Sequence, residues 1–149
     1  MQPKPAKDQN TYLHEMLESA KQAAGYVAGM SFEQFWDDQK TRDAVAMRLT
    51  VIGEAARHIT SRTVAELPRV PFHHISGLRN RIVHDYGGVN FRVVWTVAQE
   101  ELQPLIGELE QYALHQQKPM RQTQRALEEK RLTLKPMAPK PKLGPQVEL

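Results

Sequence analysis

Residues 38–60 read DQKTRDAVAMRLTVIGEAARHIT. Apolar side chains recur in this segment at intervals of three or four residues, the spacing that places them on one face of an α-helix. The stripe is unbroken and consists of Val45, Leu49, Ile52, Ala56 and Ile59. The sequence therefore predicts a helix from about Asp38 to Thr60, and it is the best-supported helix in the chain.

Segments on both sides of this helix carry the same periodicity. The segment from about Asp8 to Ala28 has its apolar positions at Leu13, Leu17, Ala20, Ala24 and Val27. Pro71 opens the segment FHHISGLRNRIVHDY, which is expected to face inward through Phe72, Ile75, Leu78, Ile82 and Val83. A last helix capped by Asn90 carries Val94, Val97, Leu102, Leu105, Leu109 and Tyr112 on or near one side.

Local signals mark where these helices start, break and bend. Ser31 and Gln34 have the spacing of a capping box, which predicts a short helical turn carrying Phe32, Phe35 and Trp36. Pro68 interrupts the segment after residue 60, and Pro104 is expected to bend the last helix. The chain has no alternating strand pattern of useful length and no internal repeat. We therefore predict an all-α fold, an antiparallel bundle of four to five helices.

The charge of the chain is unevenly distributed. Residues 1–117 hold 12 lysines and arginines against 14 acidic residues, whereas residues 118–149 hold eight basic residues against three acidic ones. Five of the ten prolines also lie in that last segment. We predict a helical domain over residues 8–117 and a basic, proline- and lysine-rich tail over residues 118–149, flexible or partly helical. A role of the tail in RNA binding stays open.

The composition also indicates in which cellular compartment the protein is expected. The chain contains no cysteine, which excludes disulfides, thiolate zinc sites and a cysteine nucleophile. The first ten residues, MQPKPAKDQN, lack the apolar region of a signal peptide, and no apolar run approaches the roughly 18 residues of a membrane helix. We expect a soluble, cytoplasmic protein that does not enter a membrane.

Several polar side chains, among them an arginine, a histidine and a tyrosine, lie close together in residues 79–88, RNRIVHDYGG, at the end of the third long helix. The negative end of a helix dipole favours the cationic form of a histidine, so His84 is suited to proton transfer. An arginine such as Arg79 can bind an oxyanion through its N–H donors. Arg79 and His84 are five residues apart, about 140° around an ideal helix, so only a slightly unwound end would bring both to one cleft. Gly87 and Gly88 are expected to end the helix with positive φ.

These residues alone leave a plainer interpretation open. Arg79 could pair with Asp85 or a neighbouring carboxylate while His84 caps the helix. Other candidates are weaker: His73 and His74 are adjacent and point about 100° apart, which does not suit a shared metal. Trp36 and Trp95 are expected to anchor the core or a dimer interface.

A resemblance favours the functional interpretation. The stretch GLRNRIVHDYGGVNFRVVW, preceded by VIGEAARHI and followed by LQPLIGELE, resembles the HEPN superfamily, specifically the HepT-like toxins of toxin–antitoxin systems that pair a HEPN protein with a minimal nucleotidyltransferase. That family carries the motif R-x-x-x-x-H-x-Y, which Arg79, His84 and Tyr86 match, with Asn80 in the polar position after the arginine. The similarity extends over roughly residues 10–115.

The resemblance implies an endoribonuclease, a hydrolase of RNA that needs no metal or other cofactor and acts as a homodimer with a composite cleft. His84 would be the general base or acid, Arg79 the phosphate clamp and Asn80 a group that orients Arg79 or the phosphate. Asp85 would steer His84 or remain in solvent. Glu54 would support the site by pairing with Arg79 or Arg81.

The resemblance also implies regulation by the cognate nucleotidyltransferase antitoxin, which would transfer AMP to Tyr86. The added phosphodiester is expected to lie beside Arg79 and to block the RNA phosphate. The alternative function is a non-catalytic helical subunit that binds a nucleotide or regulates a two-chain nucleotidyltransferase.

Overall fold

The structure, a computed structural model, describes residues 7–134, apart from the side chains of residues 118–123. The described residues contain no strand. They form the α-helices α1 (Gln9–Val27), α2 (Phe32–Asp37), α3 (Gln39–Arg57), α4 (Ser61–Glu66), α5 (Phe72–His84), α6 (Phe91–Thr96) and α7 (Leu102–Thr133), with a 3₁₀ turn η1 (Tyr86–Gly88) and a π-helical segment η2 (Val97–Glu101). The predicted all-α class is confirmed. Among these residues, no helix is both long and apolar enough to cross a membrane.

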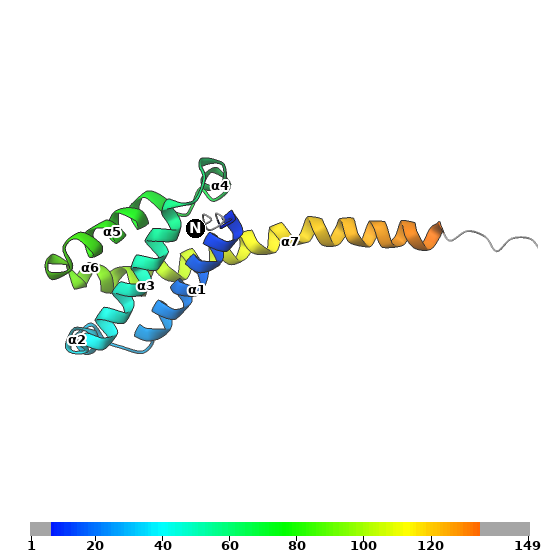
Figure 1. The fold of residues 1–149 in the computed structure, drawn as a ribbon. Helices are drawn as coiled ribbons and strands as arrows, with labels where there is room; N and C mark the ends of the chain where they lie inside the picture. The colour runs from blue at the N-terminus through cyan, green and yellow to red at the C-terminus, as the bar shows by residue number, and fades with distance from the viewer. Residues whose placement is uncertain (1–6, 135–149) are drawn as a thin grey trace, which may run out of the picture. The chain divides into compact units, whose positions relative to one another are not determined.

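The chain divides into two compact units, residues 1–113 and residues 114–149. In the first unit, α3 lies between α1 and α5 and contacts both (Figure 1). The helices α2 and α6 and the segment η2 complete the packing around these three. The helix α7 runs from Leu102 to Thr133.

Side-chain caps mark the starts of α1, α2 and α3. Asp8 and Asp38 cap α1 and α3 by accepting from the backbone of Thr11 and Thr41. Ser31 begins α2, and the predicted capping box is complete because the side chain of Gln34 also accepts from the Ser31 backbone. These contacts satisfy N–H groups that have no partner inside the helix.

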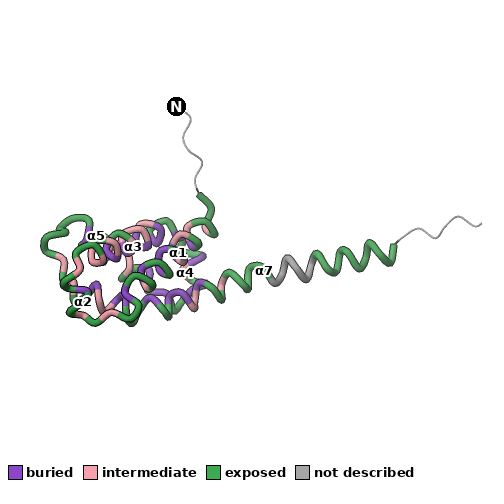
Figure 2. Tube along the Cα trace, turned by 90° about the horizontal axis from the view of Figure 1, so that it is seen from below, coloured by how far each residue is buried: buried purple, intermediate pink, exposed green. Residues whose placement is uncertain are grey.

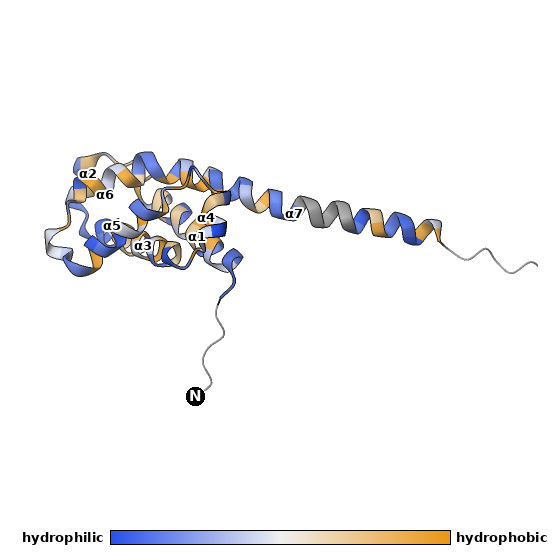
Figure 3. Ribbon diagram, turned by 90° about the horizontal axis from the view of Figure 1, so that it is seen from above, coloured by the Kyte–Doolittle hydropathy of each residue, from blue (hydrophilic) through white to orange (hydrophobic). Residues whose placement is uncertain are grey.

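The predicted apolar stripes form the core of the first unit (Figures 2 and 3). Val45, Leu49 and Ile52 of α3 are buried between the neighbouring helices. Val83 is an exception, because its side chain is 48% exposed although it was expected to face inward. The buried residue next to it is Ile82, and one step along a helix turns the side chain by about 100°, so both cannot face α3.

Two local features differ from the sequence interpretation. Residues 61–66 form the short helix α4, capped by Thr60, before the break at Pro68. The π-helical segment η2 ends at Glu101, so it lies directly before the first turn of α7, which contains Pro104. The chain is helical without interruption from Phe91 to Thr133, so Pro104 lies inside a continuous helix, and the π-helical segment η2 is the local departure from α-helical geometry beside the N–H that the proline lacks.

Candidate active site

Gly53 allows α5 to approach α3 closely at the motif arginine. Gly53 is buried, and a Cβ placed on it would lie 2.2 Å from Arg79 Cβ and 3.0 Å from the Ile75 carbonyl oxygen. Those distances leave no room for a methyl group. The glycine in the VIGEA segment therefore sets how near Arg79 lies to α3.

Arg79 is held by acceptors from two directions. Its Nη2 lies 3.1 Å from Glu54 Oε2, and its Nη1 donates to Asn80 Oδ1 at 3.0 Å. The side chain is only 19% exposed, and its Nε is buried with no hydrogen-bond partner among the described residues. The contact expected between Glu54 and Arg79 is thus present, and Asn80 contacts the arginine directly.

The Glu54 carboxylate also contacts Arg57 and His58. It lies 3.4 Å from Arg57 Nη1 and 3.4 Å from His58 Nε2. His58 in turn stacks on Tyr12, with ring centroids 4.8 Å apart. The carboxylate is thus shared between the guanidinium groups of Arg57 and Arg79 and also lies near the His58 imidazole, so its interaction is not with Arg79 alone.

His84 is the last residue of α5, and its side chain is exposed. Within the described part of the chain the imidazole has no hydrogen bond or ion pair. It lines an open pocket of about 520 Å³ together with Asn80, Arg81 and Asp85. Both ring nitrogens are therefore available to a molecule that enters this pocket.

Asp85 shapes the turn after His84. Its Oδ1 accepts from the Gly88 N–H at 3.0 Å, and a Cβ on Gly88 would lie 2.1 Å from Asp85 Oδ2. The expected positive φ at Gly87 and Gly88 is wrong, since in the described chain only Gly29 has one. The helix ends instead at Asp85, whose φ is −148°, and Gly88 is needed for the close approach of the carboxylate.

Tyr86 turns away from this pocket toward the start of α3. Its hydroxyl donates to Asp43 Oδ1, and its ring meets Phe91 edge-on at 5.8 Å between centroids. Partial burial raises the pKa of the Tyr86 phenol to about 12, and the hydrogen bond and negative charge of Asp43 act in the same direction. The phenol remains 42% exposed, so it is accessible from solvent.

The motif residues of one chain do not converge. Arg79 borders a groove with Tyr12, Glu54 and His58, whereas His84 lines the separate pocket described above. This divergence follows from the regular helix between them, since five residues turn about 140°. The slight unwinding that would bring both to one cleft is absent, because α5 is helical through His84.

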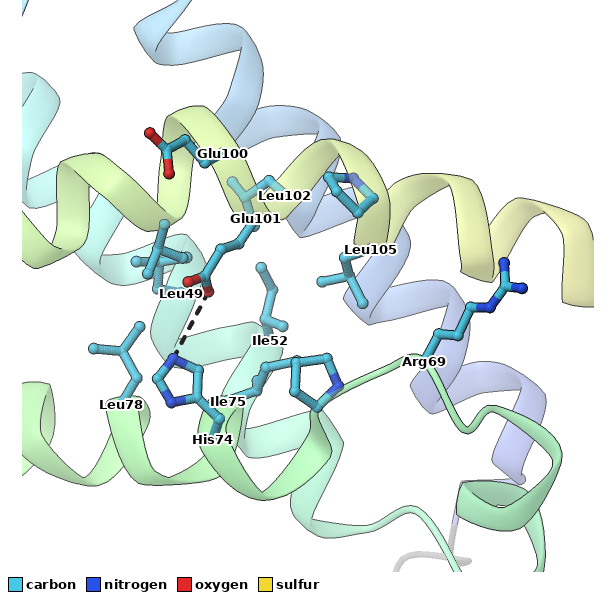
Figure 4. Close-up of a pocket in the computed structure, with 13 residues that line it drawn as sticks. Leu49, Ile52, Arg69, His74, Ile75, Leu78, Glu100, Glu101, Leu102 and Leu105 are labelled. Carbon is cyan, nitrogen blue, oxygen red and sulfur yellow. Dashed lines mark ion pairs between the residues drawn. The ribbon is translucent and has the colours of Figure 1, made fainter.

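A second cavity, of about 360 Å³, lies between α3, α5 and the start of α7 (Figure 4). Its lining is mainly apolar, including Leu49, Ile52 and Leu105. His74 and Glu101 face each other across it at 3.7 Å. None of the motif residues lines this cavity. No group of three or more histidine or acidic side chains in the described chain is placed to hold a metal ion.

The two tryptophans have different surroundings. Trp95 packs against Phe35 and Phe32, with ring centroids 5.2 and 6.1 Å apart. Trp36 is 51% exposed, and the guanidinium carbon of Arg42 lies 5.0 Å from the centroid of its ring. Trp95 therefore belongs to the core, whereas Trp36 lies at the surface beside an arginine.

Arg42 and Asp43 are site residues that sequence reasoning missed. Asp43 precedes Tyr86 by 43 residues, and no spacing rule connects positions so far apart. The guanidinium of Arg42 also stacks on Phe91 at 5.2 Å, and Phe91 contacts Tyr86. The positive charge of Arg42 partly offsets the rise in the Tyr86 pKa.

Comparison with known proteins identifies the family. The family described as Ribonuclease HepT-like matches residues 16–112. A Methanocaldococcus jannaschii protein named as a candidate RNase is 32% identical over 107 residues, which cover 72% of this chain and 88% of the relative. A Thermococcus cleftensis protein named as a probable ribonuclease HepT is 31% identical over 99 residues, which cover 66% of this chain and 90% of the relative. No solved structure matches the chain.

The family match spans the segments that carry Glu54, Arg79, His84 and Tyr86. Together with the two relatives, it confirms the resemblance drawn from the motif and the predicted class of enzyme, a ribonuclease. The chain belongs to the HepT-like ribonuclease family.

Proposed function

We propose that the chain is the toxin of a toxin–antitoxin pair, a metal-independent endoribonuclease of the cytoplasm that acts as a homodimer. Its activity would be silenced when a partner minimal nucleotidyltransferase transfers AMP to Tyr86. The observation that carries the proposal is the arrangement at the end of α5, where an exposed histidine lines an open pocket five residues after an arginine that two acceptors orient.

The chemistry needs few groups. An RNA 2′-hydroxyl attacks the adjacent phosphorus, its proton passes to a base, and the bond to the 5′-oxygen breaks as that oxygen takes a proton from an acid. His84 of each chain serves as base or acid. Arg79 stabilises the extra negative charge of the pentavalent phosphate through its N–H donors.

A homodimer supplies what one chain lacks. A single chain has one motif histidine, and its Arg79 and His84 border separate surface hollows. Two chains that pair through α5 and the first turns of α7 would set two histidines and two arginines around one composite cleft. This supports pairing as the arrangement in which the motif becomes catalytic.

Tyr86 suits the role of AMP acceptor. Its ring is exposed, and its hydroxyl is held by a single side chain, Asp43. The phenol points away from the His84 pocket toward Asp43, so a bulky nucleotide on it would add a phosphodiester anion at the edge of the cleft that the two chains would share. Modification would therefore hinder the entry of an RNA phosphate without disturbing the core.

The test uses the purified full-length chain. RNA should be cut in the presence of EDTA, and cutting should stop after incubation with the partner enzyme, ATP and magnesium. Intact-mass measurement should then show AMP-sized increments on wild type and none on Tyr86→Phe. Absence of cleavage by the unmodified chain would refute the ribonuclease, and unchanged labelling of Tyr86→Phe would refute the acceptor.

A further inference from the structure

We propose that Asp43 and Arg42 complete an acceptor site around Tyr86: Asp43 takes the phenolic proton during nucleotide transfer, and Arg42 binds the transferred phosphate. The inference rests on the proposed function, because it concerns the modification of Tyr86. It assigns part of the transfer chemistry to the toxin itself and not only to the partner enzyme. We call Tyr86, Asp43 and Arg42 the acceptor triad.

The hydrogen bond between Tyr86 and Asp43 is the first observation. The phenol donates to Asp43 Oδ1, and this carboxylate lies near the start of α3 on the exposed side of the helix. Both side chains reach solvent, so an approaching nucleotide can meet them together. Asp43 also fixes the direction of the phenolic oxygen, which orients its lone pairs for attack.

The phenol needs a base. With a pKa of about 12, Tyr86 is protonated at neutral pH, so its oxygen becomes a good nucleophile only as the proton leaves. A carboxylate already in hydrogen-bond contact is the nearest acceptor for that proton. Protein kinases use an aspartate in the same relation to a substrate hydroxyl.

Arg42 supplies the second part of the triad. Its guanidinium stacks on the rings of Trp36 and Phe91, and its Nε is buried with no hydrogen-bond partner among the described residues. The structure gives Arg42 no carboxylate partner within the described chain. The buried Nε is out of reach of a ligand, but the terminal Nη groups make no hydrogen bond or ion pair in the described chain, so their donors can bind a phosphate oxygen.

The transfer balances as follows. The Tyr86 oxygen forms a bond to the α-phosphorus of a nucleoside triphosphate, and the bond from that phosphorus to the β-phosphate oxygen breaks. Pyrophosphate leaves with the bonding electrons, and the phenolic proton passes to Asp43 Oδ1 and then to solvent. The product ester has no hydrogen to donate to Asp43, and Arg42 offsets the new phosphodiester charge that lies near the carboxylate.

The experiment measures the rate of AMP addition by intact mass, using the full-length chain, the partner nucleotidyltransferase, ATP and magnesium. We expect wild type to react at a nearly constant rate between about pH 7 and 9, because with a base in contact the phenol need not ionise before it attacks. Asp43→Asn should react about 10²-fold more slowly or worse at pH 7. Its residual rate should rise with pH as more phenol ionises, and Asp43→Glu should recover part of the loss.

Control variants show whether a slower reaction comes from loss of the base, from a change in charge or from misfolding. Asp37→Asn removes an exposed carboxylate from the neighbouring helix α2 and should react like wild type. Arg42→Gln and Arg42→Lys should lower the rate at every pH without changing the shape of the profile. Thermal melting of each variant shows that the bundle is intact.

Two results would overturn the inference. One is an Asp43→Asn chain that takes AMP as fast as wild type. The other is an Asp43→Asn rate that is lower than that of wild type by the same factor at every pH, which would mean that Asp43 is only a structural contact. A wild-type chain that takes no AMP at all would instead refute the proposed silencing, and this inference with it.

Discussion

Gly53 lies against Arg79 so closely that a Cβ on the glycine would come within 2.2 Å of Arg79 Cβ. A buried glycine in α3 therefore positions the motif arginine of α5. The same approach brings Arg79 Nη2 to 3.1 Å from Glu54, the residue after the glycine. The close packing of α5 on α3 therefore also determines the position of the Arg79 guanidinium.

Replacing Gly53 with alanine should therefore affect stability and activity together. The added methyl group forces α5 away from α3, and overpacking of this kind costs about 1–3 kcal/mol. Cleavage of RNA should fall because Arg79 moves with the helix. Gly25→Ala is the matched control, since a Cβ there meets nothing within 4 Å. Urea unfolding and an RNA cleavage assay measure both effects, and an unaltered Gly53→Ala protein would contradict the packing argument.

His84→Ala should abolish RNA cleavage and leave the fold intact. Loss of a positioned acid or base costs about 10²–10⁴-fold in rate. The side chain is exposed and makes no hydrogen bond or ion pair within the described chain. His73→Ala, an exposed histidine of the same helix outside the motif, should retain activity. Full activity in a folded His84→Ala protein would remove His84 from the mechanism.

Mixed dimers test the composite cleft. Arg79→Ala and His84→Ala chains should each be inactive alone, because each lacks one kind of group in both copies. Co-expressed, they form hybrid dimers with one intact arginine and one intact histidine, which should regain only a small part of the wild-type rate because the second proton-transfer group is still missing. Sedimentation should find dimers at micromolar concentration, and a monomer under those conditions would argue against a shared cleft.

Deleting residues 119–149 should leave the melting temperature nearly unchanged. The described side chains from residue 124 to residue 134 are all exposed, so they add little to a core. The helical circular dichroism signal should fall, because α7 continues to Thr133. A chain that ends at Leu134 is the matched control and should keep that signal. A large drop in melting temperature on the longer deletion would show that the tail stabilises the bundle.

Alkaline titration tests the environment of Tyr86. Ultraviolet difference absorbance between wild type and Tyr86→Phe should show a phenol with a pKa of about 12. Since this pKa is raised on folding, the contribution of Tyr86 to stability is present below about pH 10 and is lost as pH rises through 12. Asp43→Asn should bring the pKa closer to 10, and a phenol that already titrates near 10 in wild type would contradict the contact.

Much of the secondary structure could be predicted from the sequence because helix periodicity and caps depend on residues close together in the chain. The stripe of Val45, Leu49 and Ile52 depends only on helical period, and it is buried as expected. The capping box at Ser31 depends on two residues three positions apart, and both its hydrogen bonds are present. The glycine prediction at residues 87 and 88 was wrong because a side chain, that of Asp85, ended the helix without a left-handed turn.

The amino-acid sequence was sufficient for the helix pattern, the caps, the motif residues and the family, since each depends on neighbours along the chain. The directions in which Arg79, His84 and Tyr86 point were not available from it. Arg79 meets Glu54 and Tyr86 meets Asp43 because α5 packs on α3, and these contacts join residues 25 and 43 positions apart. Packing of two helices selects which side chains meet, and that choice depends on the combined fit of the whole core and not on any short pattern.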